Sequence, residues 1–175
     1  MRQDRSDTIW QGLIAGFIGY ATIAISVGLA DVAQGRSFFF TVSLLGGWLF
    51  YGQHDPMNVV VWPGAVFAYN GLHFVTFLSF GLLSSWLAAL SERGPLYWYA
   101  MLVLYLFVFV HLLAAVVLMT EPMRSAISMT QIWIPSLLSV VAMSAYLLWQ
   151  RPLLRREMDA WVGNDDELAE EHGPV

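Results

Sequence analysis

The chain has 175 residues, of which 58% are hydrophobic and only 12% charged, and its formal net charge is −5. This balance is far from that of a soluble globular domain, where about a quarter of the residues are charged. No basic patch suggests a nucleic-acid partner, and the absence of cysteine excludes disulfides, thiolate metal sites and cysteine nucleophiles. The composition therefore predicts an integral membrane protein whose main partner is the lipid bilayer.

The apolar runs, taken in chain order, predict membrane-spanning helices. The first run is longer than the apolar region of a signal peptide, so we expect it to be retained as a span. Two later stretches, at 63–90 and 95–119, contain no charged residue, and a hydrocarbon core about 30 Å thick needs only roughly 20 apolar residues of helix. Glycine and proline breakers lie near the ends of these runs. Four transmembrane helices are expected, over residues 8–29, 64–90, 96–119 and 131–150.

The segment 37–51 is apolar but too short for a comfortable crossing. Its helix would reach roughly 22 Å, and Gly46 and Gly47 interrupt it. Four spans with a cytoplasmic N-terminus place six arginines inside and two outside, whereas a fifth span would give five and three. We therefore expect 37–51 to be a short re-entrant or interfacial segment beside an all-α bundle of four transmembrane helices.

The organisation predicted is a single transmembrane domain, residues 1–156, followed by an acidic tail. Residues 157–175 carry seven acidic side chains, a composition typical of a solvated, disordered end. Arg151, Arg155 and Arg156 follow the last apolar run and place the C-terminus in the cytoplasm. We predict a multi-pass protein of a bacterial inner (plasma) membrane with both termini cytoplasmic.

Small residues gather on one side of the first span. Gly12 and Gly16 form a Gly-x-x-x-Gly pair, and Ala15 and Gly19 lie on the same third of the helix circumference. Such seams let helix backbones approach closely in lipid, where the expulsion of water no longer drives association. Gly12, Ala15, Gly16 and Gly19 are thus predicted helix-packing residues, either inside this chain's own bundle or against a homo-oligomer or partner subunit.

Two ionisable residues lie well inside the predicted spans, and such residues are functional candidates because they are costly in lipid. His73 in 64–90 and His111 in 96–119 are expected at nearly the same depth on antiparallel helices. Two imidazoles in an apolar bundle are the axial ligands that a b-type haem requires. The alternatives are hydrogen bonding alone, with Asn70 or Thr76 near His73 and Ser136 or Ser139 near His111, and a proton or quinone site.

The loops outside the predicted spans hold a second set of candidate ligands. Thioether and imidazole groups suit Cu(I), although methionine at a membrane surface is commonly apolar filler. The charged loop residues Asp31, Arg36, Asp55, Glu121 and Arg124 are expected to form ion pairs or to face a partner. The candidate metal residues are His54, Met57, Met119 and Met123.

No catalytic motif accompanies these features, so we predict that the chain is not an enzyme. The leading hypothesis is a non-catalytic subunit of a respiratory or energy-transducing membrane assembly, packed against a membrane-protein partner or further copies of itself. One alternative is a subunit that binds haem b or interacts with quinone through His73 and His111. The other is copper or metal handling at the outer face.

Overall fold

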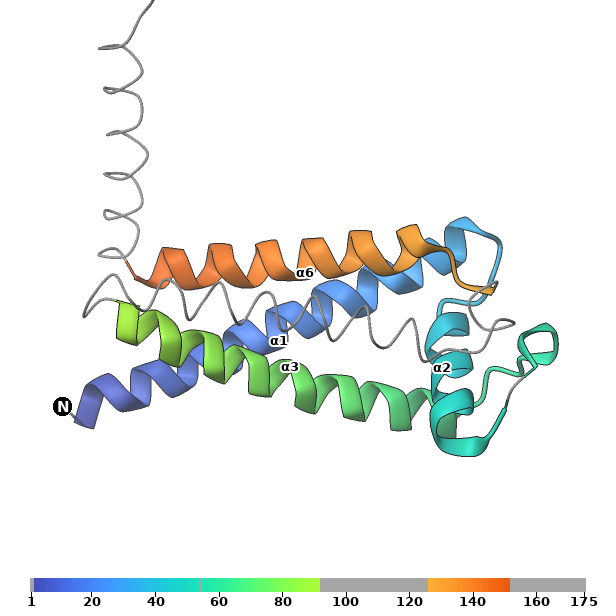
Figure 1. Cartoon of the computed structure of the whole chain (residues 1–175), viewed down its shortest axis with the longest axis horizontal. Helices are drawn as coiled ribbons and strands as arrows, with labels where there is room; N and C mark the ends of the chain where they lie inside the picture. The colour runs from blue at the N-terminus through green and yellow to red at the C-terminus, as the bar shows by residue number, and fades with distance from the viewer. Residues whose placement is uncertain (1, 54, 92–125, 152–175) are drawn as a thin grey trace, which may run out of the picture.

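The computed structural model describes residues 2–53, 55–91 and 126–151, and the described part contains three long helices and one short one (Figure 1). Helix α1 is Arg2–Ala33, α2 is Phe40–Tyr51, α3 is Pro63–Ser91 and α6 is Met129–Gln150, with a 3-10 turn η1 at Pro56–Asn58. The expected span 96–119 and the acidic tail 157–175 lie outside the described residues. The all-helical prediction is confirmed for the part of the chain that the structure covers.

Three of these helices are long and apolar enough to cross a membrane, by length and composition: Ser6–Ala33 within α1, Pro63–Ser91 and Met129–Gln150. The expected helices over 64–90 and 131–150 match α3 and α6 within two residues at each end. Pro63 occupies the first position of α3, where its missing N–H costs nothing. A capping box between Ser128 and Gln131 starts α6.

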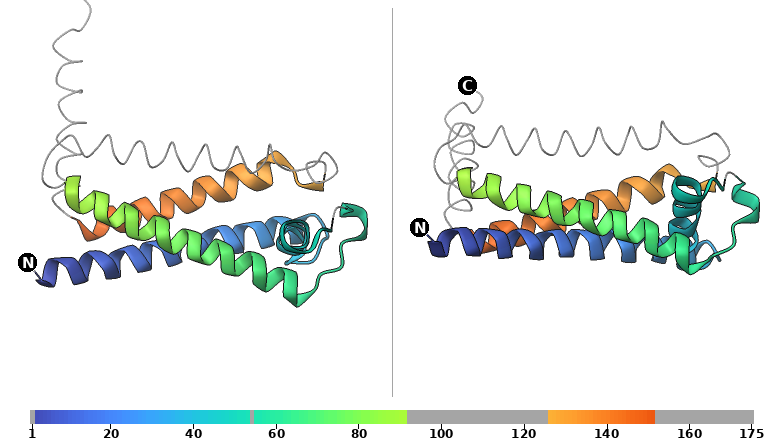
Figure 2. Two further views of the ribbon diagram at one scale, coloured as in Figure 1. Left: turned by 60° about the horizontal axis from the view of Figure 1, so that its bottom comes forward. Right: turned by 90° about the horizontal axis from the view of Figure 1, so that it is seen from below.

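The long helices pack side by side, with α1 against both α3 and α6. Helix α1 runs from the end of the bundle near the N-terminus toward α2, whereas α3 and α6 run in the opposite direction (Figure 1). Helices α3 and α6 therefore end at the same end of the bundle as the N-terminus (Figure 2). The 32 residues of α1 correspond to about 48 Å, more than the core of a bilayer requires.

Helix α2 lies across the other end of this bundle, roughly perpendicular to the long helices (Figures 1 and 2). Its 12 residues reach about 18 Å, too short to cross a bilayer. Residues 41–47 are buried, and the backbone of Gly46 lies directly against Ala65 of α3. Leu44, Leu45 and Ile127 form the buried apolar cluster at this end. The short apolar segment is therefore a helix that closes one end of the bundle.

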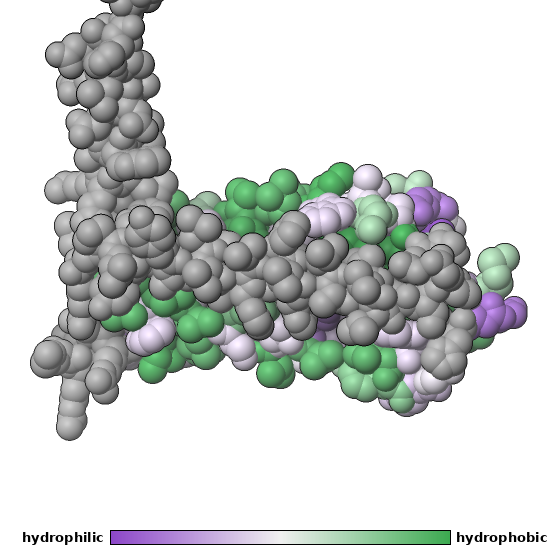
Figure 3. All heavy atoms as spheres, in the orientation of Figure 1, coloured by the Kyte–Doolittle hydropathy of each residue, from purple (hydrophilic) through white to green (hydrophobic). Residues whose placement is uncertain are grey.

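The outer surface of the long helices is mainly apolar. In Figure 3 the visible parts of these helices are largely hydrophobic, and hydrophilic residues gather at the end where α2 lies. Large exposed side chains are found on all three helices, among them Trp10, Phe17, Phe67, Val75, Leu137 and Val141. A surface of this kind is unfavourable in water and suits lipid or another apolar partner.

Candidate functional site

The most buried charged side chain of the described residues is Asp31, near the C-terminal end of α1. Its side chain has no exposed surface. The Thr41 N–H donates to Oδ2 at 2.8 Å, the Thr41 hydroxyl donates to Oδ1 at 2.8 Å, and Nε2 of Gln131 donates to Oδ1 at 3.3 Å. We call Asp31, Thr41 and Gln131 the Asp31 junction, because it joins α1, α2 and α6.

The Asp31 junction explains how α2 begins. The N-cap residue of α2, Phe39, makes no side-chain hydrogen bond to the helix. Thr41 is the second residue of α2, so its N–H is one of the donors that an α-helix leaves unpaired at its start. Asp31, ten residues earlier in the chain, supplies the acceptor for this N–H.

The junction corrects one sequence expectation. Asp31 was expected to form a loop ion pair or to face a partner, but it lies inside α1 and its three donors are neutral groups. The nearby Arg36 is directed elsewhere: its Nη1 donates to the carbonyl of Ala126 at 2.8 Å, and its guanidinium lies 4.6 Å from the centre of the Phe40 ring. The two side chains therefore hold the same end of the bundle together through different contacts, and they form no ion pair with each other.

The small-residue seam of α1 packs inside the chain. A Cβ added at Gly16 would lie 2.5 Å from the Phe77 carbonyl oxygen and 2.8 Å from Leu78 Cα, and one at Gly12 would lie 2.7 Å from Leu82 Cα. These distances leave no room for a side chain between α1 and α3. Ala15 in the same seam is fully buried.

The seam continues from α3 onto α6. Gly19 faces the side chains of Met143 and Phe77, and its carbonyl accepts a hydrogen bond of 2.9 Å from the buried Ser139 hydroxyl. The predicted packing residues therefore lie where α1 contacts both other long helices. Gly81, which the sequence reading did not single out, is the matching small residue on α3, where its Cα approaches the Gly12 backbone.

His73 lies on α3, where its ring is flanked by two aromatic rings of the same helix. The Tyr69 ring stacks on it with centroids 4.4 Å apart, and Phe77 lies 6.1 Å away at a tilt of 38°. Asn70 accepts a hydrogen bond from the Tyr20 hydroxyl at 3.1 Å, and the Thr76 hydroxyl donates to the Leu72 carbonyl at 2.8 Å. The second proposed haem ligand, His111, lies outside the described residues.

The two serines considered as partners for His111 have other acceptors for their hydroxyl hydrogens. Ser136 donates to the carbonyl of Ile132 at 2.7 Å, and Ser139 donates to that of Gly19. Both hydroxyl groups thus serve the backbone of α6 or α1 within the described part of the chain. Each of these oxygens can still accept a hydrogen bond from another group, but its hydrogen is already donated.

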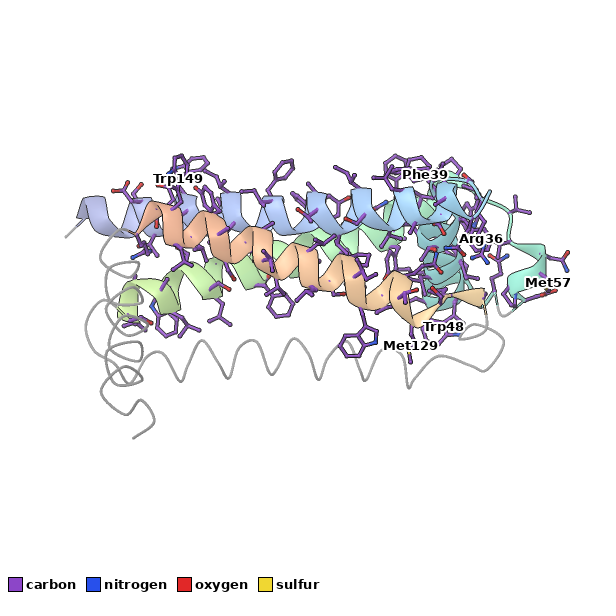
Figure 4. All side chains as sticks on the ribbon, turned by 90° about the horizontal axis from the view of Figure 1, so that it is seen from above. Arg36, Phe39, Trp48, Met57, Met129 and Trp149 are labelled. Carbon is purple, nitrogen blue, oxygen red and sulfur yellow. The ribbon has the colours of Figure 1, made fainter. Side chains whose placement is uncertain are left out.

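Of the four candidate metal residues, only Met57 is described; His54, Met119 and Met123 are not. Met57 is 89% exposed on the turn η1, and Figure 4 shows it projecting beyond the end of the bundle. Asp55 accepts hydrogen bonds from the Met57 N–H and the Asn58 amide. The hydrogen bond from Asn58, followed by that from Met57, lowers the pKa of the Asp55 carboxyl. Within the described ranges, no group of three histidine or acidic side chains could hold a metal ion.

A polar contact at the opposite end was missed by the sequence reading. Arg151 is 7% exposed, and its Nη2 donates to Thr8 Oγ1 at 3.3 Å. The Ser85 hydroxyl donates to the Thr8 carbonyl at 2.8 Å. Thr8 of α1 therefore contacts both α3 and the residue that follows α6, so polar contacts join the three long helices at this end, whereas the Asp31 junction joins α1, α2 and α6 at the other.

The described architecture is that of an all-helical protein with three helices able to span a membrane. No family model, curated protein or solved structure matches the chain.

Proposed function

We propose that the chain is a four-span protein of a bacterial inner membrane that acts as a non-catalytic subunit of a membrane assembly, with a respiratory or energy-transducing complex as its setting. The observation that carries the proposal is a contrast between the inside and the outside of the bundle. Buried polar groups such as Asp31 and Ser139 join helices to one another, whereas the outer faces carry large apolar side chains. This arrangement supports a packing role.

Aromatic residues support the membrane placement. Trp10, Trp86 and Trp149 are exposed near the end that holds the N-terminus, and Tyr51 and Trp62 are exposed near α2. Such rings prefer the two boundaries between hydrocarbon and water. The 22 residues of α6 span about 33 Å, close to the thickness of a hydrocarbon core.

The directions of the helices support a fourth span. Helix α3 ends beside the N-terminus, whereas α6 begins at the end where α2 lies. If both helices cross the bilayer, the chain between them must return from one side to the other. The uncharged run 96–119 is long enough for that crossing. With four spans both termini lie on one side, and the excess of arginine assigns that side to the cytoplasm.

Purification from native membranes tests the proposed role. A chain with a C-terminal tag, extracted in mild detergent, is expected to bring down a membrane-protein partner or further copies of itself in fixed ratio, because its exposed apolar faces would then be covered. Untagged membranes provide the control. Recovery of a free monomer under all extraction conditions would contradict the subunit role while leaving the membrane placement intact.

The haem alternative is decided by an optical spectrum. The stacking of Tyr69 on His73, with the tilted Phe77 ring nearby, favours a packed histidine, so we expect the protein purified from haem-replete cells to lack a Soret band and a reducible alpha band. Bands that disappear in both His73→Ala and His111→Ala, but persist in Thr76→Ala, would instead establish a b-type cytochrome. Metal handling through His54 and the outer-face methionines remains the second alternative; Met57 is suitably exposed for it.

A further inference from the structure

The end of the bundle beside α2 carries an exposed apolar surface that the packing of the helices does not use. It combines the C-terminal turn of α2 with the extended residues that lead into α3. We call it the aromatic end surface, and its members are all exposed: Leu49, Phe50, Tyr51, Val60, Val61 and Trp62. The Tyr51 and Trp62 rings meet edge to face with centroids 4.5 Å apart.

Hydrogen bonds hold the two parts of this surface together. The Ser43 hydroxyl, which is fully buried, donates to the Val60 carbonyl at 3.3 Å and accepts from the Trp62 N–H at 3.4 Å. Gly52 ends α2 in a left-handed conformation, with φ of 66°. The Gln53 side chain donates to the Asn58 carbonyl at 3.3 Å. These contacts fix the two segments that form the aromatic end surface relative to each other.

We infer that the aromatic end surface rests in the headgroup region of the bilayer's outer leaflet, so that α2 lies along the membrane plane. The inference depends on the proposed membrane placement. Helix α2 is roughly perpendicular to the spanning helices and lies at their end, which puts it at the boundary of the hydrocarbon core. Tryptophan and tyrosine favour this depth because one edge of the ring is polar and the rest is apolar.

The residues next to the aromatic end surface favour lipid as the molecule that covers it. Helix α3 follows Trp62 directly, and Phe67 is exposed one turn after this helix begins. The polar turn containing Asp55 and Asn58 lies beyond the aromatic end surface, on the side away from the bundle, as the position of Met57 in Figure 4 shows. Apolar, aromatic and polar residues therefore follow one another in the order in which a bilayer changes from hydrocarbon to water.

Because the chain contains no cysteine, single cysteines carrying a nitroxide label can measure depth in liposomes of phosphatidylcholine and phosphatidylglycerol. Three positions suffice: Phe50→Cys on the surface, Met57→Cys on the polar turn, and Leu137→Cys on the outside of α6. Leu137 lies about 12 Å along α6 from its first residue. Its label is expected within about 5 Å of the bilayer centre, because half of a hydrocarbon core is about 15 Å thick.

The label at Phe50 is expected about 15 to 22 Å from the centre, in the headgroup region, and the label at Met57 farther out, in water. Equal aqueous exposure of the Phe50 and Met57 labels would overturn the inference. Exposure at Phe50 in liposomes together with protection in native membranes would also overturn it, in favour of a protein partner. Aqueous exposure of Leu137 would instead reject the proposed spanning arrangement, so the two failures are distinguishable. Far-UV circular dichroism establishes that each labelled variant is folded.

Discussion

Asp31→Ala is expected to lower the free energy of unfolding by about 3 kcal/mol, because three hydrogen bonds of about 1 kcal/mol each lose their acceptor. The Thr41 N–H, the Thr41 hydroxyl and the Gln131 amide would all remain in a buried site after losing their common acceptor. Asp31→Asn is expected to lie between the wild type and Asp31→Ala. Its amide oxygen can still accept, but its NH₂ group would face a donor.

Denaturant titration in detergent micelles, followed by circular dichroism, measures the effect. Asp55→Ala is the matched control, because Asp55 also accepts hydrogen bonds from neighbouring residues but lies on an exposed turn, where loss of a capping side chain typically costs about 1 kcal/mol. The double variant of Asp31→Ala with Thr41→Val should cost less than the two single losses together, since they share one hydrogen bond. Equal unfolding midpoints for Asp31→Ala and Asp55→Ala would show that the junction contributes no more than the exposed turn.

Gly16→Leu is expected to destabilise the bundle by about 1 to 3 kcal/mol, the usual range for overpacking. The new side chain would start 2.5 Å from the Phe77 carbonyl oxygen. Because that neighbour is backbone, it cannot move aside by a change of rotamer, and α1 would have to separate from α3. The separation would also weaken the hydrogen bond between Ser139 and the Gly19 carbonyl.

The control for this prediction is Gly71→Leu, on the exposed face of α3. A Cβ at Gly71 meets nothing within 4 Å, and replacing a glycine within a helix removes its unfavourable helix propensity. Gly71→Leu should therefore leave stability unchanged or slightly raised. If thermal unfolding of the two variants gave the same midpoint, the close approach of α1 and α3 would not be needed for the fold.

The helices themselves were predictable because their signals are local. A proline at the start of α3 and a run of uncharged residues define that helix within one residue at each end. The first helix is longer than expected, since hydropathy marks only the part of α1 that suits lipid. Its additional residues at the N-terminal end, 2–7, are polar, and those at the C-terminal end, 30–33, include the charged Asp31. The expected end of the span at residue 29 placed Asp31 in a loop and thereby concealed its role.

The contacts between helices could be predicted only in part. The spacing of Gly12, Ala15, Gly16 and Gly19 indicates one face of α1, but no pattern in the sequence names Gly81 or Phe77 as its neighbours. The Asp31 junction joins residues 10 and 100 positions apart, and the contact between Arg151 and Thr8 joins residues 143 positions apart. Hydrogen bonds of this kind depend on how helices are placed in space, which periodicity does not specify.

The spacing of the Asp31 junction along the chain also has a consequence for biosynthesis. The Thr41 donors emerge from the ribosome shortly after Asp31, whereas Gln131 follows 100 residues later. At about 5 to 20 residues per second, that interval is on the order of 5 to 20 seconds. During this time the Asp31 carboxyl has been synthesised, but α6, which carries its donor Gln131, has not. Neither end of the bundle can therefore be complete until α6 is synthesised, because Gln131 is needed at the end beside α2 and Arg151 at the other.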